Sequence, residues 1–255
     1  MAPLKKLPLT VAVIACDAES QLGPLLDSVG FAQEVLVVDS GSADATVGLC
    51  LSRGARVIEQ GWLGFGRQKQ FAVAQASHDW VLCLDADERV TPALARSIEA
   101  ALRSPRYLAW RMARRNRFLG SWLAHGEGYP DWCIRLFHRA HANWSSDDVH
   151  ESVLTTTPVG TLDGDLLHES AQDVGDYLDK QNRYTTLQAE AMYHQGLRSN
   201  YAQLFLSPLV RFVKFYLLRG GFLDGGPGFA HIVISCNNAF QKYLKLIERQ
   251  TRGRD

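Results

Sequence analysis

The sequence predicts an α/β fold in which a mostly parallel sheet carries helices on both faces and a helical appendage follows. Three observations predict it. Short, nearly continuous apolar runs alternate with helical segments in the first half, as expected of parallel strands buried on both faces. Carboxylates follow three of these runs, at Asp17, Asp39 and Asp85. The last third is helical in pattern. Ligands of such sheets bind beyond the carboxyl ends of the strands, so the three acids mark a candidate site.

Four strands and their connecting helices are predicted in the first half. The strands are short apolar runs, at 9–15, 35–38, 55–59 and 80–84. Helical segments lie between them at 19–29 and 67–76, and Gly41, Ser42 and Asp44 provide a turn and a cap for another. Thr91-Pro92 begins a further helix, since proline is permitted in the first turn.

The rest of the chain changes from strands to helices. Strands are predicted at 107–112, 132–138 and 159–167, with a Gly-rich aromatic loop at 120–132. Helices are predicted at 173–196, 201–218 and 229–249, with a breaker at 220–228 that is rich in Gly and Pro.

Composition excludes several classes of protein. The 255 residues include 27 basic and 27 acidic side chains, a balance that argues against a nucleic-acid-binding protein. Five scattered cysteines form no CxxC pair, so we expect neither a disulfide framework nor a zinc knuckle, but a reducing, cytoplasmic compartment. The sequence predicts no signal peptide and no membrane-spanning helix.

Asp85 and Asp87 are the strongest candidate metal ligands. They stand one residue apart at the end of a predicted buried strand. Their oxygens suit Mg²⁺ or Mn²⁺, which can bridge to a diphosphate and neutralise charge on a leaving group. A D-x-D triplet is common, and on its own it would be interpreted as a solvated turn. The other strand-end carboxylates favour the metal site.

Residues 11–90 resemble the nucleotide-binding half of family 2 glycosyltransferases. The resemblance rests on four blocks in order, at 13–19 (VIACDAE), 37–46 (VVDSGSADAT), 67–70 (RQKQ) and 84–88 (LDADE). The later blocks resemble the lipopolysaccharide core glucosyltransferase branch, at 132–137 (WCIRLF), 148–152 (DVHES), 164–168 (GDLLH) and 221–225 (GFLDG). The resemblance implies a nucleotide-sugar-binding fold of the GT-A type. It also implies a catalytic domain over 1–170, with a donor half at about 9–90 and an acceptor half at 91–170, and a helical, membrane-associating segment at 171–255.

The resemblance also implies roles in donor binding. Ala15 and Glu19 would line the nucleotide pocket, and Asp39 would accept a hydrogen bond from the base. Lys69 would lie near the nucleotide or its diphosphate. The remaining roles concern the metal: Asp87 would bind it directly, Asp85 would reach the ribose or a metal-bound water, and His168 would complete the metal shell. Two departures from the family pattern, Asp39-Ser40 and Cys16-Asp17, leave the preferred base open.

Transfer to a hydroxyl needs a base, and the resemblance favours Glu151, with Asp148 as the second candidate. His150 would shape the acceptor site. Arg114, Arg117 and Arg135 belong to an arginine-rich stretch that suits an acidic acceptor, although scattered surface charge is an equal interpretation.

The apolar helix at 204–218 carries Arg211 and Lys214, a pattern that favours an anionic membrane surface. The alternatives are packing on the sheet or on a second copy of the chain, as a homodimer.

The sequence therefore predicts an inverting, metal-dependent transferase. It would move a hexose, glucose, from a UDP-sugar to a sugar hydroxyl of an acidic glycolipid, the lipopolysaccharide inner core, on the cytoplasmic face of the inner membrane. Three alternatives stay open: a polyprenyl phosphate or other glycolipid acceptor, a nucleotidyltransferase, and a non-catalytic nucleotide-sugar-binding or membrane scaffold protein. The acidic loop after the first strand disfavours the nucleotidyltransferase.

Overall fold

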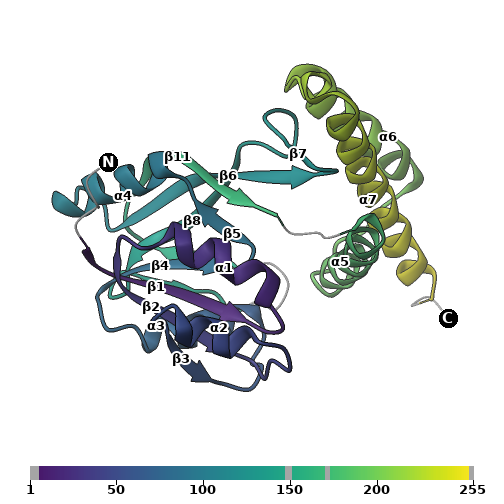
Figure 1. The fold of residues 1–255 in the computed structure, drawn as a ribbon. Coiled ribbons are helices and arrows are strands. Elements are labelled where there is room, and N and C mark those ends of the chain that lie inside the picture. The colour runs from purple at the N-terminus through teal and green to yellow at the C-terminus, as the bar shows by residue number, and fades with distance from the viewer. Residues whose placement is uncertain (1–5, 147–150, 170–172, 253–255) are drawn as a thin grey trace. The chain divides into compact units, whose positions relative to one another are not determined.

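A computed structural model describes residues 6–146, 151–169 and 173–252 (Figure 1). The chain forms two compact units. The N-terminal unit comprises the described residues up to Arg114 together with 132–168, and the C-terminal unit comprises 115–131 together with the residues from Glu169 onward. The sequence interpretation counted 115–131 within the first domain, whereas here this segment belongs with the C-terminal helices.

The N-terminal unit is built on a mixed sheet, which confirms the expected α/β class. The sheet has the order β3-β2-β1-β4-β8-β6-β11-β5, and β7 pairs with β6. Its first four strands are parallel: β3 (Arg56–Glu59), β2 (Ala32–Asp39), β1 (Leu7–Ala15) and β4 (Trp80–Asp85).

The other half of the sheet contains antiparallel pairs, so "mostly parallel" holds only for the first four strands. Antiparallel pairs join β4 to β8 (Asp131–His138) and β5 (Glu88–Val90) to β11 (Val159–His168). Only two residues separate β4 from β5 in the chain, yet β5 lies beside β11, at the other end of the strand order. The remaining strands are β6 (Ala109–Phe118), β7 (Ser121–Trp122) and a separate antiparallel pair, β9 (Ala142–Trp144) with β10 (Val153–Thr155).

Helices pack on both faces of the parallel strands, as predicted. Along β1, Leu9, Val11 and Val13 contribute to a buried cluster with α1 (Glu19–Ser28), α2 (Thr46–Ser52) and α4 (Pro92–Arg103). Ala12 points into a second cluster with α3 (Phe65–Ala74) and the β9–β10 pair. Because both faces are buried, the strand sequences are continuous apolar runs.

The C-terminal unit is a group of packed helices. It contains α5 (Val174–His194), α6 (Tyr201–Phe212), the π-helix η1 (Val213–Leu218), the 3₁₀-helix η2 (Gly221–Asp224) and α7 (Gly225–Arg252). Both α5 and α6 pack against α7 (Figure 1). The predicted breaker at 220–228 is too long, because α7 already begins at Gly225. Pro227 is tolerated there, since the first-turn N–H groups have no partner within a helix. Within the described residues, none of the helices has the length and apolar character to cross a membrane.

Candidate functional site

The loops that follow β1 and β2 are locked together by hydrogen bonds. Asp17 adopts a left-handed backbone (φ 48°), and its Oδ1 accepts from the Ala43 N–H at 2.7 Å. Asp44 Oδ2 accepts from the Glu19 N–H at 3.1 Å, and Glu19 Oε2 accepts from the Ala45 N–H at 3.4 Å. These contacts give a fixed rim to the carboxyl edge of the sheet, which is the edge where parallel sheets bind ligands.

Asp39 lies at the end of β2 and is almost fully buried. Its Oδ2 accepts from the N–H groups of Gly41 and Ser42 at 3.0 and 2.9 Å, and its Oδ1 accepts from the Ser42 hydroxyl at 2.5 Å. Ala15 is also buried, and its carbonyl accepts from the Ser40 N–H at 2.9 Å. Asp39 therefore shapes its own turn, and Oδ1 keeps capacity for one further donor.

The turn between β4 and β5 carries a buried group of charges. Arg135 Nη2 lies 2.5 Å from Asp85 Oδ2 and 2.7 Å from Glu88 Oε1. Arg114 Nη1 is 3.2 Å from the same Glu88 oxygen, and the Asp85 N–H donates to Glu88 Oε2 at 3.0 Å. Glu88 is completely buried and Arg135 is 5% exposed. Burial of these charges is tolerated because each is paired and hydrogen-bonded.

Lys69 joins this group to the predicted base. Its Nζ lies 2.7 Å from Asp85 Oδ1 and 2.9 Å from Glu151 Oε1, and the side chain is 5% exposed. The ammonium also sits 4.8 Å from the centre of the Trp144 ring. The structure thus brings together three residues predicted separately, Lys69, Asp85 and Glu151.

These charges determine the ionisation of Asp85. Burial alone would raise the pKa of Asp85, but the charges of Arg135 and Lys69, and the hydrogen bond from Lys69, lower it well below its usual range. Burial would likewise lower the pKa of Arg135, and Asp85 and Glu88 raise it instead. Asp85 is therefore a permanent anion whose two oxygens are both engaged by cations.

Asp87 and His168 face each other at the end of the sheet. His168 pairs with Glu88 across strands β11 and β5. The His168 Nε2 lies 3.4 Å from Asp87 Oδ2. Two ligands each about 2.1 Å from one octahedral cation lie about 3 Å apart, so this pair is spaced to share a cation.

Among the described residues, no group of three or more His, Cys, Asp or Glu side chains could hold a metal ion. A divalent cation here would take its remaining ligands from phosphate and water, as Mg²⁺ usually does. The local charge also fits a cation, since Asp85, Asp87, Glu88 and Glu151 outnumber the three neighbouring cations.

Several predicted acceptor residues have other partners. Arg135 is buried against Asp85 and Glu88, so it serves these carboxylates rather than a ligand from solvent. Arg114 pairs with Glu88, and Arg117 lies in the C-terminal unit, where it pairs with Glu169. Asp148 and His150 lie outside the described residues.

Sequence reasoning did not single out Glu88, Trp144 or the glutamines beside Lys69. Gln68 is buried and donates to the Ser40 hydroxyl at 3.0 Å, and Gln70 Oε1 accepts from the Trp144 N–H at 2.9 Å. Trp144 in turn lies against Lys69 and Arg135. The RQKQ block could have indicated this, because consecutive polar residues in a helix that packs on a sheet need buried partners.

Comparisons with known proteins identify the family of the chain and several relatives. A family model described as Glycosyl transferase family 2 matches residues 10–156. The lipopolysaccharide core biosynthesis glycosyltransferase LpsC of Rhizobium meliloti is 31% identical over 254 residues, covering 96% of this chain and 94% of that protein. An uncharacterized glycosyltransferase of Rickettsia typhi is 29% identical over 97% of this chain and 89% of its own length.

Solved structures also align with the chain. S. aureus TarS 1–349 aligns with a TM-score of 0.48 and 13% identity, covering 96% of this chain and 91% of TarS. Glucosyl-3-phosphoglycerate synthase from Mycobacterium tuberculosis, in complex with Mn²⁺, UDP and glucosyl-3-phosphoglycerate, aligns with a TM-score of 0.47 and 16% identity, covering 75% and 81%.

Proposed function

The chain belongs to glycosyltransferase family 2, and from that premise we propose that it is an inverting, metal-dependent hexosyltransferase. It transfers glucose from UDP-glucose to a sugar hydroxyl of the lipopolysaccharide inner core. The relation to LpsC supports an acceptor of this class. The observation that carries the proposal is the group of Lys69, Asp85, Asp87, Glu151 and His168 at the carboxyl edge of the sheet.

The donor binds along the loops after β1 and β2. Ala15 and Glu19 line the nucleotide, and Asp39 Oδ1, already oriented by Ser42, accepts from the base. Lys69 places a buried positive charge beside Asp85, where it attracts the diphosphate. Asp85 is held by Lys69 and Arg135, and it orients the ribose or a metal-bound water.

Asp87 and His168 would hold a divalent cation, Mg²⁺ or Mn²⁺, and such an ion would supply positive charge for the departing diphosphate. Arg135 and Lys69 keep Asp85 ionised, so the negative charge that favours a cation persists at every physiological pH.

Glu151 is the base. The acceptor hydroxyl oxygen attacks the anomeric carbon as the bond to the diphosphate breaks, and the hydroxyl proton passes to the Glu151 carboxylate. Lys69 fixes the position of this carboxylate through a 2.9 Å ion pair. Attack opposite the leaving group inverts the anomeric configuration.

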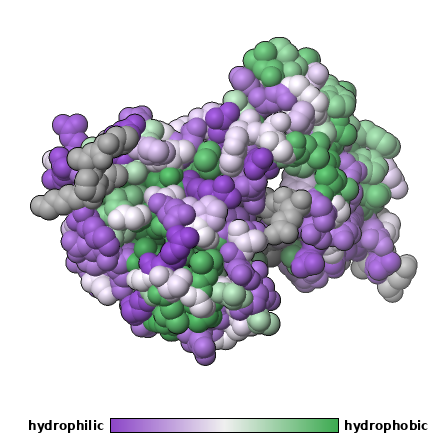
Figure 2. All heavy atoms as spheres, viewed as in Figure 1, coloured by the Kyte–Doolittle hydropathy of each residue, from purple (hydrophilic) through white to green (hydrophobic). Residues whose placement is uncertain are grey.

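The C-terminal unit places the enzyme on an anionic membrane, on the cytoplasmic face of the inner membrane. Large apolar side chains are exposed along α6 and η1, among them Phe205, Leu206, Leu209, Val210, Leu217 and Leu218. Figure 2 shows hydrophobic residues gathered over these helices. Arg211 does not flank this surface as the sequence suggested, because it pairs with Glu127; Lys214 and Arg219 are the exposed basic residues of η1 and its end. A monomeric soluble protein rarely exposes so large an apolar patch without a partner.

The test is donor binding by calorimetry. Wild type, Asp87→Ala and the control Asp163→Ala, an exposed acid on the same strand as His168, are titrated with UDP-glucose, UDP-galactose and ADP- and GDP-sugars, with Mn²⁺, Mg²⁺ or neither. We expect metal-dependent binding of UDP-glucose by wild type and Asp163→Ala, weakened by about 10–100-fold or more in Asp87→Ala, since even residues that only orient a metal ligand contribute that much to metal affinity. Equal binding with and without metal would refute the metal site, and no binding of any donor would return the chain to a scaffold role.

A further inference from the structure

The two longest helices of the C-terminal unit present polar residues where packing alone would favour apolar ones. On α5, Tyr177, Gln181, Thr185 and Gln188 recur at spacings of four, four and three. On α7, His231, Ser235, Asn238 and Lys242 recur at four, three and four. Such spacing puts each set on one face of its helix. All eight residues line one cavity of about 330 Å³ within this unit.

The polar groups at this cavity are held in position by one another. Asn238 donates to Gln181 Oε1 at 2.7 Å. Glu127, from the segment before β8, is paired with Arg211 and accepts from the Ser235 hydroxyl. Burying polar side chains costs free energy unless they are satisfied, so a purely structural seam would use leucine or valine here. Fixed amides and hydroxyls around an open volume are typical of ligand sites, whose volumes start at about 300 Å³.

Aromatic rings form one side of the cavity. Tyr177 and His231 have ring centres 6.4 Å apart, and both lie 5.3 Å from Phe118. Burial, with a contribution from Glu127, raises the pKa of Tyr177 to about 12, so its hydroxyl stays a donor. Burial lowers the pKa of His231, which keeps the ring neutral. The His231 Nδ1 is buried and has no hydrogen-bond partner among the described residues.

The ligand chemistry follows from these groups. The charged residues at the cavity balance, since Glu127 and Asp131 oppose Arg211 and Lys242. A neutral ligand with many hydroxyls matches amides, which both donate and accept, and its C–H faces match aromatic rings.

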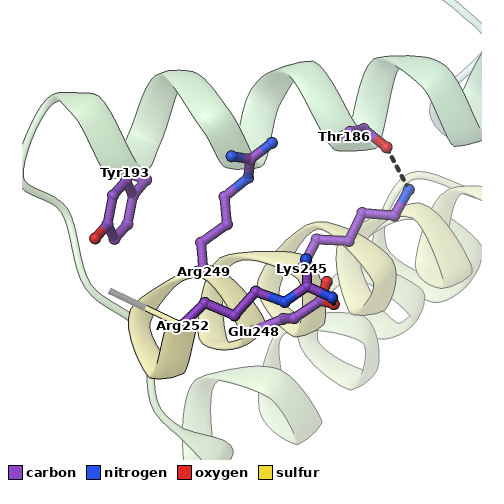
Figure 3. A pocket seen from close by; sticks show the side chains of 6 residues that line it. All are labelled: Thr186, Tyr193, Lys245, Glu248, Arg249 and Arg252. Carbon is purple, nitrogen blue, oxygen red and sulfur yellow. Dashed lines mark hydrogen bonds and ion pairs between the residues drawn. The ribbon is translucent and has the colours of Figure 1, made fainter. Parts of the chain in front are cut away.

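A second hollow between α5 and α7 has fewer polar groups available to a ligand (Figure 3). Its lysine and arginines are already engaged: Lys245 Nζ donates to Thr186 and Thr185 at 2.8 Å, Arg249 pairs with Glu190, and Arg252 pairs with Glu248. An anion would have to displace these partners, so this hollow serves as the comparison site.

We propose that the cavity between α5 and α7 binds a neutral sugar residue of the acceptor saccharide. This sugar is a different one from the sugar that receives the hexose. This inference rests on the proposed function for the identity of the acceptor, and it adds a saccharide-binding subsite in the C-terminal unit.

The test uses the double variant Gln181→Met/Asn238→Leu. Replacing both partners of a hydrogen bond with apolar groups of similar shape is nearly neutral for stability, so the fold is retained while the amides are lost. Arg252→Ala, in the hollow of Figure 3, is the matched control. Each protein is titrated with deacylated lipopolysaccharide core oligosaccharide, without donor or metal, and thermal unfolding verifies the fold.

We expect the oligosaccharide to bind wild type and Arg252→Ala equally and the double variant about tenfold more weakly, with a matching rise in acceptor KM. Equal affinity for all three proteins, or no binding to wild type, would overturn the proposal. Metal-dependent donor binding, measured on the same wild-type sample, separates this failure from failure of the proposed function. If the donor does not bind but the oligosaccharide does, the subsite stands and the transferase proposal falls.

Discussion

The two units bury polar groups in different ways. In the N-terminal unit, Arg135, Lys69 and Glu88 are buried, and they form with the partly exposed Asp85 a group whose contacts are 2.5–2.7 Å long. In the C-terminal unit, the principal charged pair, Glu127 with Arg211, is 23% and 36% exposed and borders a cavity.

This difference follows from the architecture of each unit. Asp85 ends the parallel strand β4, and Arg135 of the antiparallel neighbour β8 and Lys69 of α3 reach it there, so charges from distant parts of the sequence converge and can stabilise one another. Packed helices offer long faces instead, which provide a cavity on one side and an apolar surface on another. The first arrangement underlies the donor chemistry proposed above, and the second underlies the proposed binding of an acceptor and a membrane.

The largest effect should come from removing the proposed base. Glu151→Gln should lower kcat about 10²–10⁴-fold, because a carboxamide cannot accept the proton, while the affinity for UDP-glucose changes little. Steady-state transfer and donor titration measure the two. Glu59→Gln, an exposed acid at the end of β3, is the control. A kcat within tenfold of wild type would place the base elsewhere, and it would favour a phosphate acceptor, which needs no strong base.

The next effect contrasts the stability contributions of the two charged groups. Arg135→Met leaves Asp85 and Glu88 without their main buried partner, and it should lower the free energy of unfolding by about 3–5 kcal/mol. Arg211→Met breaks a pair that water can reach, and it should cost about 1 kcal/mol or less. Urea unfolding followed by fluorescence measures both. Similar losses in the two variants would show that the units do not differ in this way.

The contrast also explains what could be predicted from sequence. The apolar runs 9–15, 35–38 and 80–84 identify strands because two-sided burial favours apolar residues there, and the one polar residue of these runs, Thr10, is buried with a hydrogen bond to Glu34. Asp85 and Asp87 could be singled out because they follow directly after the run 80–84. The pairing of Arg135 with Glu88 spans 47 residues, and nothing local in either segment encodes it.

Part of the lining of the C-terminal cavity could be predicted from the sequence. The polar spacing on α5 and α7 is visible in the sequence once both helices are assigned. The assignment of 115–131 to the C-terminal unit was not, because it depends on contacts such as Glu127 with Arg211, 84 residues apart. The apolar character of α6 could be predicted from its sequence. The position of the Arg211 side chain could not, because it depends on the same distant partner, Glu127.

The smallest effect is expected for vesicle binding, which compares the exposed apolar surfaces of the two units. Leu209→Glu should weaken binding to anionic vesicles at least tenfold, because it removes an exposed leucine whose burial in the membrane would be worth about 1.5–3 kcal/mol, and adds a repelled charge. Leu51→Glu is the matched control, since Leu51 is 58% exposed in α2 and Leu209 is 59% exposed in α6. Flotation with phosphatidylserine and phosphatidylcholine vesicles measures the affinity, and light scattering measures the molar mass.

Two outcomes would contradict this prediction. If wild type binds neither vesicle type and Leu209→Glu converts a dimer to a monomer, α6 packs on a second copy of the chain instead of a membrane. A loss of vesicle binding in Leu51→Glu as large as in Leu209→Glu would remove the distinction between the units, because membrane contact would then follow any exposed leucine.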